Sequence, residues 1–78
     1  MLIKPDGSKC YYEHKLTLSE MQALVEGYIE CIFFNDDCVA VVNEEGKIKG
    51  MQHNPTASIF VGQDLYGPVL IFSKELIL

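Results

Sequence analysis

Few residues of this chain could perform chemistry: three cysteines, two histidines and two pairs of adjacent acids. Cys31, Cys38 and His53 could in principle bind zinc, but a structural zinc site usually has four ligands in closely spaced pairs. Here the two cysteines are seven residues apart and no second pair exists. The pattern instead indicates thiols that act as small hydrophobic side chains. We therefore expect no metal and no cofactor.

The acidic pairs Asp36-Asp37 and Glu44-Glu45 stand in stretches that are typical of turns. Adjacent acids could act as general acid and base or bind a divalent ion, but the DxDxDG pattern of a calcium loop is missing. One interpretation is that these acids contact a partner, and the other is that water merely solvates them. No catalytic residue is predicted, so the sequence favours a protein that is not an enzyme.

Two polar residues, Glu30 and Asn43, lie within apolar segments that are typical of strands. One interpretation is a polar pocket on a sheet, completed by Gln22 and Tyr28, that binds a small molecule. The alternative is that Asn43 forms a turn and Glu30 points to solvent. The residues alone leave both alternatives open.

Length and charge limit the class of partner. A chain of 78 residues is one domain, residues 1–78. Its net charge is −5, and all six basic residues are lysines. Proteins that grip phosphates usually cluster Lys and Arg, and Arg supplies the bidentate fork, so we expect no direct nucleic-acid binding. The apolar end, Leu76, Ile77 and Leu78, either completes the core or contacts a second copy in a homodimer.

The sequence also indicates where the protein resides. The odd number of cysteines, with no CxxC pair, argues against a disulfide framework. We find no signal peptide and no apolar run near the ~20 residues that a membrane span needs. We therefore expect a cytoplasmic protein without membrane contact.

The most informative local pattern is a helix from residue 18 onward. Thr17 and Glu20 form a capping box, and Gly27 is expected to end the helix in a left-handed conformation. A second helix is expected after Asn54 and Pro55, before Gly62. Strands are expected at residues 2–4, 9–13, 28–34, 38–42, 47–49 and 69–72. The order β-(β)-α-β-β-(β)-α-β predicts an α+β fold with one small mixed sheet and two helices.

Several motifs resemble a family of small phage, plasmid and prokaryotic proteins that is catalogued only as a domain of unknown function. They are IKPDG, TLSEMQALVEGYIE, VVNEEGKIKG, the Asn54-Pro55-x-Ala57 element and GPVLI, within residues 2–72. The most specific positions are Leu18, Gln22, Val25, Gly27, Tyr28, Ile29 and Glu30, followed by residues 43–47. The chain departs from the pattern at Glu26, where a second Gly is expected, and at Pro68, where an acidic residue is expected.

The resemblance implies a mobile-element context and no particular activity. Together with the size, the acidity and the lack of a catalytic constellation, it favours a non-enzymatic protein that binds and inhibits a host defence complex, as anti-CRISPR proteins do. If the protein is phage-encoded, it would act in the host cytoplasm. The alternative is an oligomeric protein that binds a small molecule such as a nucleotide signal.

Overall fold

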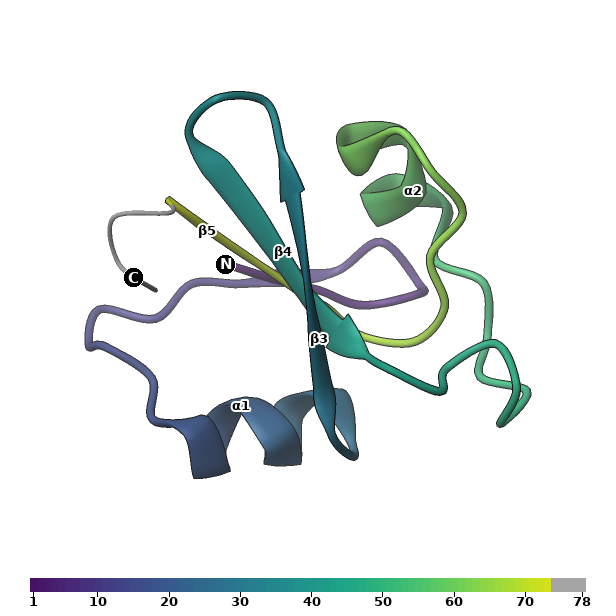
Figure 1. The fold of residues 1–78 in the computed structure, drawn as a ribbon, viewed down its shortest axis with the longest axis horizontal. Helices are drawn as coiled ribbons and strands as arrows, with labels where there is room; N and C mark the ends of the chain where they lie inside the picture. Colours follow the sequence, from purple (N-terminus) through teal and green to yellow (C-terminus); the bar gives the residue numbers. More distant parts are fainter. Residues whose placement is uncertain (74–78) are drawn as a thin grey trace.

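The structure, a computed structural model, describes residues 1–73, so the apolar end at Leu76 to Leu78 lies outside the described residues. It contains five strands and two helices, in an order that confirms the predicted α+β fold (Figure 1). They are β1 (Leu2–Ile3), β2 (Lys9–Cys10), α1 (Leu18–Val25), β3 (Ile29–Phe34), β4 (Cys38–Asn43), α2 (Pro55–Val61) and β5 (Val69–Ser73).

The five strands form one sheet in the order β2-β1-β5-β4-β3, and every neighbouring pair is antiparallel. The prediction of a mixed sheet is therefore wrong. Residues 44–68 leave the sheet and return to it at the same end, because Val41 of β4 pairs with Leu70 at the start of β5. A connection of this kind acts as a wide hairpin and reverses the chain direction.

The prediction of a short strand at residues 47–49 is also wrong, because residues 44–50 form consecutive turns. Backbone hydrogen bonds close these turns: the N–H of Lys49 donates to the carbonyl of Glu45, and the N–H of Met51 donates to that of Gly46. Ile48 is consequently exposed. The strand expected at residues 9–13 is shorter than predicted and covers only Lys9–Cys10.

Helix α1 begins as the sequence predicts. The backbone N–H of Glu20 donates to the Thr17 hydroxyl at 3.1 Å, and the backbone N–H of Thr17 donates to the Glu20 carboxylate at 2.9 Å. This second bond, followed by the contact with His14, lowers the pKa of the Glu20 carboxyl. The two reciprocal hydrogen bonds confirm the capping box.

The end of α1 differs from the prediction. The left-handed residue is Glu26, with φ 66° and ψ 36°, whereas Gly27 has no positive φ. Gly27 is nevertheless required to be small, because a Cβ there would lie 2.7 Å from the amide nitrogen of Asn43. Position 26 therefore requires a residue that tolerates a positive φ, and position 27 requires a residue without a Cβ. The glycine that the family pattern places at position 26 matches the first of these requirements.

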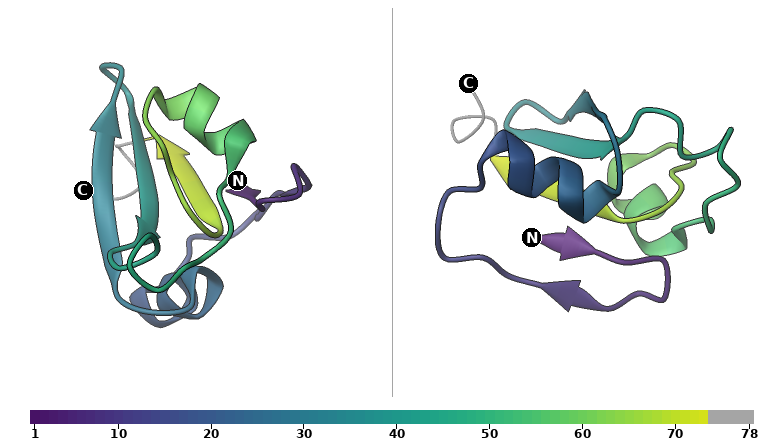
Figure 2. Two further views of the ribbon diagram at one scale, coloured as in Figure 1. Left: turned by 90° about the vertical axis from the view of Figure 1, so that its right-hand side faces the viewer. Right: turned by 90° about the horizontal axis from the view of Figure 1, so that it is seen from below.

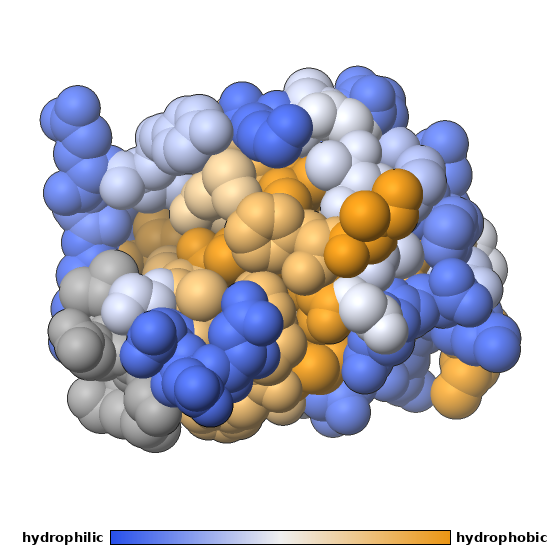
Figure 3. Space-filling view, turned by 90° about the horizontal axis from the view of Figure 1, so that it is seen from above, coloured by the Kyte–Doolittle hydropathy of each residue, from blue (hydrophilic) through white to orange (hydrophobic). Residues whose placement is uncertain are grey.

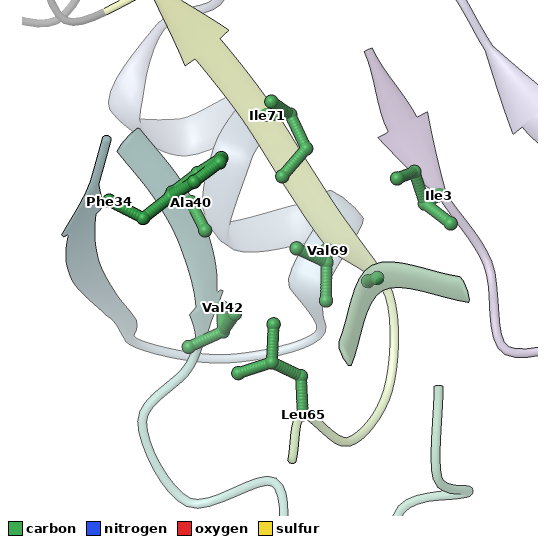
Figure 4. Packing of buried hydrophobic residues seen from close by; sticks show 8 residues of the cluster. Ile3, Phe34, Ala40, Val42, Leu65, Val69 and Ile71 are labelled. Carbon is green, nitrogen blue, oxygen red and sulfur yellow. The ribbon is translucent and has the colours of Figure 1, made fainter. Parts of the chain in front are cut away.

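The sheet separates two apolar clusters, because side chains alternate between its faces. The face under α1 buries Leu2, Leu16, Val25, Val41 and Leu70. The face under α2 buries the larger cluster shown in Figure 4: Ile3, Phe34, Ala40, Val42, Ala57, Leu65, Val69 and Ile71. Figure 2 shows the sheet between the two short helices. Each helix is only about two turns long, so each covers only part of its face of the sheet.

Candidate functional site

Helix α2 is fixed to the sheet through its N-cap, the buried Asn54. The side-chain amide of Asn54 donates to the carbonyls of Ile3 and Gly67, each at 2.9 Å. Its carbonyl oxygen accepts from the backbone N–H of Ala57 at 3.1 Å, which caps the helix as predicted. Three bonds from one buried side chain therefore tie α2 to β1 and to the segment before β5.

A second buried contact fixes the rotation of α2 about its axis. The hydroxyl of Ser58 donates to the carbonyl of Asn54 at 2.7 Å and accepts from the backbone N–H of Leu65 at 2.8 Å. Ala57 and Ser58 therefore face the sheet. Because residues on a helix are about 100° apart, the following residues Ile59 and Phe60 are turned toward solvent.

This geometry produces an exposed apolar surface, which we call the α2 surface: Ile59 and Phe60, with Phe60 packed on the buried Phe34. Ile59 is 85% exposed and Phe60 52% exposed. The Phe60 ring packs edge-to-face on Phe34 of β3, with centroids 5.8 Å apart. Four half-buried apolar residues pack against the core cluster on the same face of the sheet: Met1, Ile32, Cys38 and Val61. Figure 3 shows apolar atoms gathered at the centre of this side of the molecule, rimmed by hydrophilic residues.

The sequence analysis missed the α2 surface, although the sequence contains a signal for it. Residues 59–61 are three consecutive apolar residues in a helix of seven residues. They span about 200° around the axis, wider than the stripe of roughly 100° that a surface helix buries. At least one of them must then face water.

The two acidic pairs lie at opposite ends of β4, and the pair Asp36-Asp37 is at the end where Phe34 contacts Phe60. Asp36 and Asp37 form the exposed turn between Phe34 and Cys38, at the end of the β3–β4 hairpin. Glu44 and Glu45 follow Asn43 at the opposite end of β4. A strand of six residues separates the two pairs, which corresponds to about 20 Å. The structure thus places the four acids in two separate groups.

Two of the four proposed pocket residues come together. Glu30 and Asn43 both line a small cleft of about 130 Å³ between residues 63–66 and the open end of the β3–β4 hairpin, opposite its Asp36-Asp37 turn. Gln22 and Tyr28 are not among its lining residues. Lys47 and the carboxylates Glu44 and Asp64 complete its charged groups. Ligand sites for drug-sized molecules usually have volumes of roughly 300–1,000 Å³, so the cleft is small for a nucleotide.

Asn43 has a structural role that explains its burial. Its side-chain amide donates to the carbonyls of Val25 and Glu26 at 3.0 and 3.2 Å, and its side-chain oxygen accepts from the N–H of Glu45 at 2.8 Å. These bonds give hydrogen-bond partners both to the last carbonyl groups of α1 and to a backbone N–H of the turn after β4. The turn-forming role of Asn43, one of the two alternatives from the sequence, is therefore present, and Glu30 is exposed.

A serine, a histidine and an aspartate lie together beside α2, a cluster that the sequence analysis did not single out. The Nε2 atom of His53 lies 3.3 Å from the Ser58 hydroxyl and 3.3 Å from an Asp64 oxygen. A catalytic histidine needs one ring nitrogen for the serine and the other for the carboxylate. Here both contacts converge on the same nitrogen, and the Ser58 hydroxyl already donates to Asn54. The cluster therefore holds the 62–66 loop against α2.

The cysteine arrangement also differs from a metal site. Cys31 shares a face of the sheet with Val41, whereas Cys38 pairs with Phe34 and packs on the opposite face. The sheet thus separates the two thiols. Within residues 1–73, no group of three or more His, Cys, Asp or Glu side chains is arranged to hold a metal ion. Over the same residues, no helix is long and apolar enough to cross a membrane.

These features define a small α+β protein with an antiparallel five-stranded sheet and one helix on each face. The chain belongs to the family described as Domain of unknown function (DUF3846), whose model matches residues 1–75. This confirms the resemblance to an uncharacterised family. No curated protein and no solved structure matches the chain.

Proposed function

We propose that this protein is a non-enzymatic binding protein whose protein partner docks on the α2 surface. The observation that carries the proposal is the exposure of Ile59 and Phe60 on a helix that buried hydrogen bonds hold in place. A helix fixed in this way does not need to reorder when it binds, which lowers the entropic cost of association. Apolar patches rimmed by polar residues commonly mark protein interfaces.

The charge around the α2 surface favours a partner with a basic rim. Asp36 and Asp37 extend from the turn that follows Phe34, and the whole chain has a net charge of −5 without any arginine. A complementary partner would present an apolar pocket for Ile59 and Phe60 beside lysines or arginines that meet the two aspartates. Complexes that bind nucleic acids have such basic faces.

The partner that we propose is a host defence complex, which the protein would inhibit by occupying its basic face. The family resemblance to proteins of phages and plasmids motivates this choice. Two observations count against a nucleotide in two of the hollows of this structure. The cleft at Glu30 and Asn43 is small, and the larger hollow of about 570 Å³ between α1 and the turn after β1 has one lysine, Lys4, against the carboxylates Asp6 and Glu26. An anionic nucleotide would meet net repulsion there.

The test uses two matched pairs of variants. Ile59→Ser removes an 85% exposed side chain from the α2 surface, and Ile48→Ser removes an 84% exposed one from the turns at the other end of β4. The Asp36→Lys/Asp37→Lys variant reverses the charge beside the α2 surface, and Glu44→Lys/Glu45→Lys reverses it about 20 Å away. Tagged proteins are expressed in cells with intact defence systems, and co-purifying proteins are identified by mass spectrometry.

We expect a stoichiometric complex with the unaltered protein and with the Ile48 and Glu44/Glu45 variants. The Ile59 and Asp36/Asp37 variants should weaken that complex by about tenfold or more, as truncation of a central interface residue typically does. Equal recovery of the same complex by all variants would refute docking on the α2 surface. Recovery of a bound metabolite without a protein would instead favour the small-molecule alternative.

A further inference from the structure

Among residues 1–73, strand β3 is an edge strand with no strand paired on its outer side. It lies at the end of the strand order and pairs with β4 over six residues (Figure 2). The opposite edge, β2, is only two residues long. Edge strands of monomeric proteins are usually protected by lysines, prolines, bulges or short length. The segment Ile29–Phe34 has the sequence IECIFF, with no lysine or proline and with Glu30 as its one charged residue.

The register identifies which backbone groups are free. The N–H of Glu44 donates to the carbonyl of Tyr28 at 3.0 Å. Because hydrogen-bonded and non-hydrogen-bonded pairs alternate along antiparallel strands, residues 28, 30, 32 and 34 direct their backbone groups toward β4. Ile29, Cys31 and Phe33 therefore direct their N–H and C=O groups to the open side. The edge presents a row of alternating donors and acceptors to a further strand.

We propose that the occupant of this edge is β3 of a second copy, paired antiparallel about a two-fold axis at Cys31. In this register Cys31 lies opposite the partner's Cys31, and Ile29 lies opposite the partner's Phe33. The three outward residues of each copy then exchange backbone hydrogen bonds. On the other face of the sheet, Tyr28 lies opposite the partner's Phe34. Tyr28 is 70% exposed and Phe33 55% exposed, so both side chains gain an apolar neighbour.

The side chains select this register among those that the backbone permits. A shift toward residue 30 places Glu30 directly opposite the partner's Glu30, and like charges in that position are destabilising. A shift toward residue 32 places Tyr28 opposite the partner's Asp36 and Glu30 opposite the partner's Phe34. In the register at Cys31, Glu30 lies opposite the partner's Ile32, so no two carboxylates lie directly opposite each other. The strand is thus complementary to itself.

The dimer would bring two α2 surfaces to the same side of the assembly. Residues that face each other across antiparallel strands lie on the same face of the sheet, so both α2 helices lie on one side of a continuous sheet. Glu30 and Ile32 form part of the wall of the small cleft, so the two clefts meet across the axis. Two α2 surfaces on one side would bind a repetitive partner with avidity. This inference does not depend on the proposed function.

Two variants with equal exposure test the interface. Phe33→Lys places a charge on the open edge at a side chain that is 55% exposed, and Leu18→Lys places the same charge on α1 at one that is 56% exposed. Sedimentation equilibrium should give a dimer for the unaltered protein and for Leu18→Lys. We expect Phe33→Lys to raise the dissociation constant by about tenfold or more. Circular dichroism confirms that each variant is folded. A monomer at every concentration, or a dimer that Phe33→Lys leaves unchanged, overturns the proposal.

Cysteine cross-linking tests the register independently. Cα atoms of a hydrogen-bonded antiparallel pair are about 5.5 Å apart, within the range that a disulfide spans. In a Cys10→Ser/Cys38→Ser variant, copper phenanthroline with dissolved oxygen should take two protons and two electrons from the facing Cys31 thiols and yield a covalent dimer. Cys31→Ser, which keeps Cys10 and Cys38, should yield none. A dimer that resists cross-linking at Cys31, or that cross-links equally through Cys10, refutes this register.

Discussion

Substitution of Glu26 by glycine should stabilise the protein, although it removes a side chain from the end of a helix. Glu26 is the left-handed residue that ends α1, with φ 66° and ψ 36°. Its side chain is exposed. A residue with a Cβ is strained in this conformation, by roughly 1–2 kcal/mol, and glycine is not. The negative charge at the C-terminal end of the helix is also unfavourable, by about 0.3–1 kcal/mol.

The opposing effect is the greater freedom of glycine in the unfolded chain, which costs roughly 0.5–1 kcal/mol. The net change expected for Glu26→Gly is therefore a gain of about 1 kcal/mol in the free energy of unfolding. For a chain of 78 residues, this raises the melting temperature by about 4–8 °C.

Thermal and urea unfolding, followed by circular dichroism, measure this change. Glu26→Ala is the matched control, because it removes the charge and retains the Cβ, so only the conformational part separates the two variants. Asn35→Gly is a second control, since Asn35 also has a positive φ of 55° but tolerates it better than most residues. If Glu26→Gly is no more stable than Glu26→Ala, the assignment of the strain to position 26 is refuted.

Three further predictions concern the contacts that hold the helices. Gly27→Ala places a Cβ 2.7 Å from the Asn43 amide, so it should displace that amide and reduce the free energy of unfolding by about 1–3 kcal/mol; an unchanged urea midpoint would contradict the steric role. Asn54→Ala removes three buried hydrogen bonds and should cost at least about 2 kcal/mol in the same assay, whereas a loss below 0.5 kcal/mol would show that α2 is held otherwise. The lowered pKa of Glu20 should stabilise the protein above about pH 4.5, and this contribution should vanish as the pH falls through the lower folded-state value; Glu20→Gln should remove this part of the pH dependence, and an unchanged profile would argue against it.

The sequence predicted those elements whose signals are local. The capping box at Thr17 and Glu20 and the cap at Asn54 are short-range patterns, and both are present. The hairpin strands were predicted from β-branched and aromatic residues on either side of an Asn-Asp-Asp turn. Features that depend on distant segments were not predicted. The direction of β5 follows from where residues 44–68 return to the sheet, and no local pattern encodes that return.

The roles of individual residues were harder to predict for the same reason. Gly27 was expected to be left-handed, but its need for a small side chain comes from Asn43, sixteen residues further along the chain. The α2 surface depends on the rotation of a helix that Asn54 and Ser58 fix from beneath. The two acidic pairs look equivalent in sequence, and only the length of β4 separates them in space. Tertiary contacts therefore decide which exposed residues can act together.

The most direct test of the central claim, that a protein partner docks on the α2 surface, is the comparison of Ile59→Ser with Ile48→Ser in co-purification from cells with intact defence systems. The two side chains are equally exposed, at 85% and 84%, so both changes should leave the fold intact. The account predicts that the Ile48 variant retains a stoichiometric host complex and that the Ile59 variant loses most of it. The account would be contradicted if both variants retained the same complex, or if the unaltered protein recovered no complex.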